Sequence, residues 1–183
     1  MSAARRFIPV VTAALAVLLL DQLSKNWAEA ALDPATGGSP VKLVGGFEFR
    51  FAQNQGMAFS RFSSSGPIIG AIAVAIVVAL LLFARTVRSM TGRVIIGIVI
   101  GGALGNLADR LARAPASGNT TGFLRGAVVD FIWTSWYPTF NVADAAIVVG
   151  GIALAILAWR TPDDPVTPDP DTPDAPDPEH SAA

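Results

Sequence analysis

The 183-residue chain contains no cysteine, and its only histidine, His180, is the fourth residue from the end. Without cysteine there are no disulfides, no thiol catalysis and no cysteine-ligated metal. One histidine in a polar tail excludes a Ser-His-Asp triad and histidine-ligated zinc. Lysine is also scarce, and Ser24 and Lys25 would point about 100° apart on a helix, which disfavours a Ser-Lys dyad. We therefore expect no metal and no cofactor, and carboxylates remain as the common catalytic groups.

Charged residues are few, at 15% of the chain against 52% hydrophobic residues, which indicates an integral membrane protein. Gly66 to Ala84 carries no charge over 19 residues, close to the ~20 that a helix needs to cross a bilayer. Three other apolar segments reach that length only if they include polar residues at one end. We predict an all-α membrane protein with four transmembrane helices, at about 7–27, 66–84, 94–112 and 141–159.

Residues 161–183 have a different composition, with seven of the 14 acids, seven of the 13 prolines and no lysine or arginine. Such a segment cannot bury enough apolar surface to fold. We predict a four-span domain over residues 1–160, followed by a disordered, cytoplasmic tail. The domain itself carries 13 basic and seven acidic residues, so its net charge is +6.

Compact groups of arginine mark one side of the predicted membrane. They precede the first span, fill the link between the second and third, and follow the fourth: Arg5, Arg6, Arg85, Arg88, Arg93 and Arg160. The seven basic residues on the other side are spread over longer loops and mixed with acids. By the positive-inside rule, both termini are expected in the cytoplasm.

A cleaved signal peptide is an alternative interpretation of the N-terminus, with Ala28-Glu29-Ala30 as an A-x-A site. Asp21 and Lys25 would then lie between the apolar stretch and the cleavage site, where a peptidase requires small neutral residues. The sequence therefore favours a retained first span.

Four aspartates sit at or beside the ends of apolar segments, on the side opposite the arginine groups: Asp21, Asp109, Asp130 and Asp144. Carboxylates at a membrane boundary are costly, so a functional site is the first hypothesis. Asp21 has Lys25 at i+4, and Asp109 is followed by two arginines within one turn, so both have cations that favour ionisation. Asp130 and Asp144 have no cation within four residues. Two such carboxylates, brought together, share a proton and can activate water as base and acid.

Other interpretations of the polar residues remain. Asn106, Asp109 and Arg110 lie at i, i+3 and i+4, and such residues can simply join helices, with nearby glycines permitting close packing. A small proton- or cation-coupled transporter would place acids near mid-membrane with a path to both faces. Here the polar groups cluster at one end, which favours a hydrolase. A noncatalytic anchoring protein gives no reason for two aspartates without counter-charges.

Five motifs in order, DQLSK, NQGMAFS, GGALGNLADRL, VVDFI and FNVADAAI, resemble those of bacterial lipoprotein signal peptidase (signal peptidase II, aspartyl peptidase family A8). The resemblance covers about residues 7–159. It implies a bacterial cell-membrane endopeptidase whose active site faces the extracytoplasmic side. Such an enzyme removes signal peptides from diacylglyceryl-modified prolipoproteins by cleaving before the lipidated cysteine. The matching catalytic aspartates are Asp130 and Asp144.

The resemblance also implies positions that hold the site's shape or meet the substrate: Asp21, Lys25, Asn54, Gly56, Ala58, Phe59, Asn106, Asp109, Arg110, Asn141 and Ala143. It suggests a small extracytoplasmic β-sheet, consistent with alternating Phe47, Phe49 and Phe51. The link over residues 113–127 is longer than is usual in the family. We expect prolipoprotein and membrane lipid as partners, no nucleic acid, and a monomer.

Overall fold

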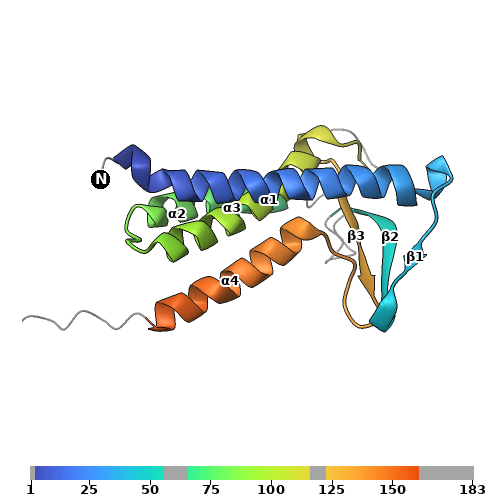
Figure 1. The fold of residues 1–183 in the computed structure, drawn as a ribbon. Coiled ribbons are helices and arrows are strands. Elements are labelled where there is room, and N and C mark those ends of the chain that lie inside the picture. The colour runs from blue at the N-terminus through green and yellow to red at the C-terminus, as the bar shows by residue number, and fades with distance from the viewer. Residues whose placement is uncertain (1–2, 56–65, 116–122, 161–183) are drawn as a thin grey trace, which may run out of the picture.

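The computed structural model describes residues 3–55, 66–115 and 123–160, which form four long helices and a small sheet (Figure 1). The helices are α1 (Ala3–Leu32), α2 (Gly66–Ala84), α3 (Met90–Ala112) and α4 (Val142–Arg160). All four are long and apolar enough to cross a membrane, which confirms the predicted fold class. The predicted tail lies outside the described residues.

The sheet lies at one end of the helices, and the N-terminal end of α1, the α2–α3 link and the end of α4 lie at the other (Figure 1). α1 has 30 residues and is therefore about 45 Å long, more than the ~30 Å of a bilayer core. Its last turns contact the sheet through Ala28 and Leu32, which are buried against Val129 and Phe131. The end of α1 and the sheet thus share one apolar cluster, and Val10, Ala14, Ala84, Ile96 and Ile100 form a second one within the helix bundle.

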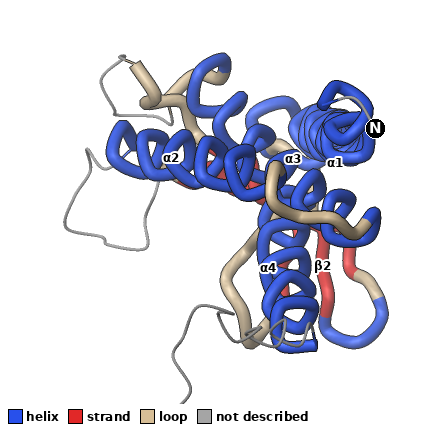
Figure 2. Tube along the Cα trace, turned by 90° about the vertical axis from the view of Figure 1, so that its left-hand side faces the viewer, coloured by secondary structure: helices blue, strands red, loops and turns tan. Residues whose placement is uncertain are grey.

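α3 is the central helix of the bundle. More than half of its span is buried, against less than a fifth of each of the others. It contacts α1, α2 and α4, and Figure 2 shows α2 and α4 on different sides of it. Two glycines make the approach close: a Cβ on Gly102 would lie 2.6 Å from the carbonyl oxygen of Ala143, and one on Gly105 would lie 2.5 Å from Asp21 Oδ2. The glycines therefore do permit the close helix packing that the sequence suggested.

The sheet contains β1 (Val41–Lys42), β2 (Phe47–Asn54) and β3 (Val128–Thr134), all antiparallel, in the order β1-β2-β3. This confirms the predicted small sheet. The β2–β3 register shifts between Phe49 and Ala52, and beyond that shift Ala52 pairs with Asp130 and Asn54 with Val128. The end of β2 therefore lies beside Asp130.

The three alternating phenylalanines of β2 are not equally buried. Phe49 and Phe51 pack against the core, and Trp27 of α1 meets the Phe49 ring edge-on at 5.4 Å between ring centroids. Phe47 is 39% exposed, because it pairs with Thr134 at the last residue of β3. The alternation of phenylalanines in the sequence predicted the strand, but it did not predict how deeply each ring is buried.

Candidate active site

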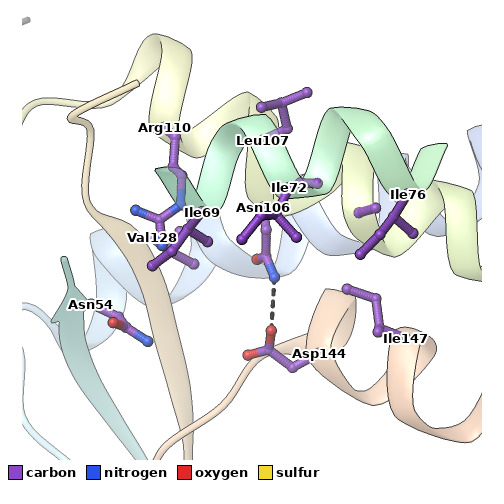
Figure 3. A pocket seen from close by; sticks show the side chains of 12 residues that line it. Asn54, Ile69, Ile72, Ile76, Asn106, Leu107, Arg110, Val128, Asp144 and Ile147 are labelled. Carbon is purple, nitrogen blue, oxygen red and sulfur yellow. Dashed lines mark hydrogen bonds between the residues drawn. The ribbon is translucent and has the colours of Figure 1, made fainter. Parts of the chain in front are cut away.

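Asp130 lies in the middle of β3, and Asp144 lies in the first turn of α4. Asp130 is 2% exposed, and each of its carboxylate oxygens accepts a hydrogen bond from an amide: Oδ1 from Asn141 Nδ2 at 2.7 Å and Oδ2 from Asn54 Nδ2 at 2.9 Å. Asp144 Oδ1 accepts from Asn106 Nδ2 at 2.7 Å (Figure 3). The structure thus places both aspartates within one hydrogen-bond network, formed by residues from β2, β3, α3 and α4.

Asn141 is the residue that joins the two carboxylates. It precedes α4, and its Oδ1 accepts from the backbone N–H of Asp144 at 2.9 Å, while Asp144 Oδ2 accepts from the backbone N–H of Asn141 at 3.3 Å. This reciprocal pair is a capping box, and it fixes Asp144 at the third helical position. The Asn141 amide N–H group, fully buried, is then free to point at Asp130.

A buried ionic cluster lies beside the aspartates and fixes the helices that carry them. Lys25 of α1 is fully buried, and its Nζ lies 2.8 Å from Asp21 Oδ2 and 2.9 Å from Asp109 Oδ2. The sequence predicted the Asp21–Lys25 pair but not the contact with Asp109. Because one ammonium contacts carboxylates on two helices, it holds α1 against α3.

The ionic cluster also reaches the site through backbone contacts. Asp21 Oδ1 accepts from the N–H of Ala143 at 2.9 Å, next to Asp144 on α4. Asp109 Oδ2 accepts from the N–H of Val129 at 3.2 Å, next to Asp130 on β3. Each of these two aspartates therefore positions the residue before one member of the pair.

Asn106 connects Lys25 to Asp144 through hydrogen bonds on both sides of its amide. Its Oδ1 accepts from Lys25 Nζ at 2.9 Å and from Asn141 Nδ2 at 3.2 Å. Both donors fix the carbonyl side of the amide, so the Nδ2 side faces Asp144. The orientation of this amide is therefore determined by its neighbours.

Burial raises the pKa of the Asp130 carboxyl to about 7, and the negative charge of Asp144 adds to the increase. The amides of Asn54 and Asn141 oppose it, because their hydrogen bonds favour the ionised form. A carboxyl with this pKa is protonated in about half of the molecules near pH 7. It can therefore donate a proton in neutral solution, as a catalytic acid must.

A cavity of about 320 Å³ opens beside Asp144, and Asp130 does not line it. Four polar residues and apolar side chains of α2, α3, α4 and β3 line the cavity (Figure 3): Asn54, Asn106, Arg110, Asp144, Ile69, Ile72, Ala73, Ile76, Ala103, Leu107, Val128 and Ile147. Arg110 is 7% exposed, and its Nη1 has no hydrogen-bond acceptor in the part of the chain that the structure describes. This donor is available to a bound molecule.

Most of the residues singled out in the sequence come together here, while Gly56, Ala58 and Phe59 lie outside the described residues. One polar residue was missed. Gln22 donates to Asp109 Oδ1 at 3.0 Å, and its place within the DQLSK motif could have identified it. Arg113, at i+4 from Asp109, was expected as a cation for this carboxylate, and its Nε donates to the same oxygen at 2.9 Å. The isoleucines of α2 had no such signal, because α2 is apolar on every face.

Comparisons with known proteins agree with one another. The model of the family signal peptidase (SPase) II matches residues 13–160. A lipoprotein signal peptidase of Rhodococcus jostii is 41% identical over 154 residues, which cover 84% of this chain and 73% of the relative. One of Streptomyces coelicolor is 39% identical over 169 residues, which cover 90% and 78%.

Two solved structures of bacterial membrane enzymes are 25% identical to this chain, with TM-scores of 0.67 and 0.63. The similarity covers 84% and 86% of this chain and 94% of each structure. The peptidase family and the membrane fold are therefore shown together. The chain belongs to the signal peptidase II family, and it is a membrane-bound hydrolase.

Proposed function

We propose that this peptidase cleaves diacylglyceryl-modified prolipoproteins before the lipidated cysteine, and that Asp130 and Asp144 activate the attacking water. One observation carries the assignment of the pair: Asn141 bonds to both carboxylates at once, through its side chain to Asp130 and through its backbone N–H to Asp144. Asp21 and Asp109 instead bind Lys25. Asp130 and Asp144 are thus the two aspartates that share a hydrogen-bonding neighbour and have no ion-pair partner among the described residues.

The proton of the pair is assigned to Asp130, because burial and the charge of Asp144 raise its pKa to about 7. Ionised Asp144 then removes a proton from water as the oxygen attacks the scissile carbonyl carbon, and Asp130 protonates the carbonyl oxygen. In the second step Asp144 returns its proton to the amide nitrogen, the C–N bond breaks, and Asp130 recovers its proton from the diol. Atoms and protons balance without any other group.

Arg110 is placed to hold the substrate. Its guanidinium lines the same cavity as Asp144, and Nη1 has no acceptor within the described residues. A backbone carbonyl of the substrate would supply that acceptor and relieve the cost of a buried, unbonded donor. Asn54 donates to Asp130 from the end of β2, so we assign it to orienting the acid.

The apolar wall of the cavity suits a substrate that stays in the bilayer. Ile69, Ile72 and Ile76 of α2 line it at i, i+3 and i+7, facing Ile147 of α4. α2 and α4 lie on different sides of α3 (Figure 2), so this wall is at the edge of the bundle. A lipidated substrate could then bring its peptide to the aspartates while its acyl chains remain among lipid.

We further infer that residues 1–160 form the peptidase domain and that the sheet end faces the extracytoplasmic side, with both termini in the cytoplasm. The compact arginine groups all lie at the opposite end, as the positive-inside rule requires. Asp21, Lys25, Asp109 and Ala143 hold the shape of the site, and we expect the chain to act as a monomer.

The transporter alternative fits these contacts less well. It requires polar groups along a path between both faces. The acids of the described residues lie in the sheet, in the halves of the helices next to it or, for Asp33, in the link after α1. Ile147 to Trp159 of α4 contains no charged residue. The family comparison independently identifies a peptidase.

The proposal is tested with purified full-length chain and a diacylglyceryl-modified prolipoprotein, with the unmodified precursor as a second substrate. Wild type should cleave only the lipidated form, before the modified cysteine, as read by mass spectrometry of both products. Asp130→Asn and Asp144→Asn should each lower the rate by about 10²–10⁴-fold. Asp33→Asn is the matched control, because Asp33 only caps a short helix through Ala35 N–H. Cleavage at wild-type rate by either catalytic variant would refute the pair.

A further inference from the structure

A second groove lies at the end of the bundle opposite the aspartates. Its volume is about 580 Å³, larger than that of the candidate active site. The end of α2, the link to α3, the start of α3 and the end of α4 form it: Phe83, Thr86, Val87, Arg88, Ser89, Gly92, Leu154, Leu157 and Ala158. The proposed reaction uses none of these residues.

The groove has an apolar wall and a polar rim. Phe83 is half exposed on α2, and Leu154 and Leu157 face it from α4. Arg88 and Ser89 lie in the link that closes the end of the groove, where the helices leave the apolar layer. An occupant must therefore offer apolar chains along the helices and a polar group at the link.

Among the described residues, the charged side chains at this end are all positive. Arg85 and Arg88 are exposed in the link, and Arg160 is exposed at the end of α4. Every ion pair within the described residues involves Lys25, Arg50 or Arg113, all at the sheet end. The arginines beside the groove thus have no carboxylate partner in the described ranges, and an anionic group is the complementary ligand.

We propose that this groove binds an anionic phospholipid, with the phosphate beside Arg88 and one acyl chain along Phe83, Leu154 and Leu157. Membrane lipids combine a negative group and long apolar chains, as the lining requires. The residues after Arg160 are another source of negative charge, with seven acids among residues 161–183. Those residues offer few apolar side chains, and Val166 is the largest of them. They could therefore supply negative charge to the polar rim of the groove but not a long apolar chain to its wall.

The test measures lipid retained by the purified full-length chain in native mass spectrometry, with dioleoylphosphatidylglycerol and dioleoylphosphatidylcholine as probes. Wild type should retain the anionic lipid preferentially. Arg88→Gln should weaken retention about fivefold, the effect of one basic residue near an anionic surface. Ala158→Trp keeps every charge but fills the groove, and it should weaken both lipids.

Arg160→Gln is the matched control, because it removes the same charge at the same end but does not line the groove. It should leave retention unchanged. If Arg88→Gln and Arg160→Gln lose bound lipid equally, the arginines attract anionic lipid without a specific site, and the proposal is refuted. Retention of lipid by Ala158→Trp at the wild-type level would also refute it. Replacing the seven acids of residues 161–183 by amides should also change nothing, and a marked gain in bound lipid would assign the groove to that segment. Cleavage at wild-type rate by Arg88→Gln and Ala158→Trp confirms that they fold.

Discussion

Asn141 is the residue whose loss should affect stability and chemistry together, so Asn141→Ala is the most informative substitution. The change removes the cap of α4, which costs about 1 kcal/mol, since Asn141 Oδ1 no longer accepts from the N–H of Asp144. It also leaves Asp130 Oδ1 without its 2.7 Å donor inside the protein, which costs about 1–3 kcal/mol. We expect a loss of about 2–4 kcal/mol in the free energy of unfolding.

Asn54→Ala separates the two effects. Asn54 donates to the other oxygen of Asp130 and does not cap α4, so this variant changes the carboxyl and leaves the capping box intact. Both amides favour the ionised form, so loss of either one raises the pKa of Asp130 further above its value of about 7. A hydrogen bond to a charged group is worth about 1.5 kcal/mol, which corresponds to roughly one pKa unit.

The assay is the pH dependence of kcat/KM for cleavage of a lipidated prolipoprotein peptide. Protonated Asp130 is the acid in the proposed mechanism, so the decline in rate at alkaline pH should move about one unit higher in both variants. Both variants should unfold at a lower temperature, because each removes a donor to the buried carboxyl of Asp130. The decrease should be larger for Asn141→Ala, which also loses the cap of α4. An alkaline decline at the wild-type pH in both variants would refute the role of Asp130 as the acid.

Four further predictions follow from the same contacts. The pKa of Asp130 is about 7 in the folded chain and 3.8 ordinarily, so protonation of Asp130 stabilises the fold fully below about pH 4, and this stability is lost as the pH rises through 7. Asp130→Asn should therefore flatten the fall of Tm between pH 5 and 8. An unchanged slope of Tm against pH would contradict a buried acid at Asp130. Lys25→Met should cost about 3–5 kcal/mol in detergent unfolding, because Asp21 and Asp109 lose their shared cation. Gly105→Ala should cost about 1–3 kcal/mol, because its Cβ would lie 2.5 Å from Asp21 Oδ2. EDTA should leave cleavage intact, and activity lost to EDTA and restored by a metal would overturn the metal-free mechanism.

The sequence was sufficient for the number and order of the spans. Charge-free lengths and the positions of the arginines predicted four spans and one polar end, and the helices follow that plan. The Asp21–Lys25 pair was also predictable, because i, i+4 spacing on a helix fixes the distance before any tertiary contact forms.

Contacts between elements were harder to predict. Lys25 binds Asp109 on another helix, and local spacing carries no information about that pairing. Arg110 follows Asp109 directly, yet it lines the cavity, because neighbouring residues on a helix point in different directions. The shift in the β2–β3 register, which brings Asn54 to Asp130, has no mark in the sequence.

The capping box shows how one motif carries two roles. Asn141 and Asp144 at i, i+3 are typical of a helix N-terminus, and the structure has that cap. The same Asn141 donates to Asp130, which lies 11 residues earlier. A cap explains the spacing fully, so only the fold could show the second contact.

The most direct test of the account is the single-turnover cleavage rate of a lipidated prolipoprotein by wild type, Asp130→Asn, Asp144→Asn and the double variant. Groups that act as one unit are strongly non-additive, because losing either one already abolishes the concerted proton transfer. The account predicts that the double variant is no slower than either single variant. A double variant slowed by the product of the two single effects, or a single variant at the wild-type rate, would contradict it.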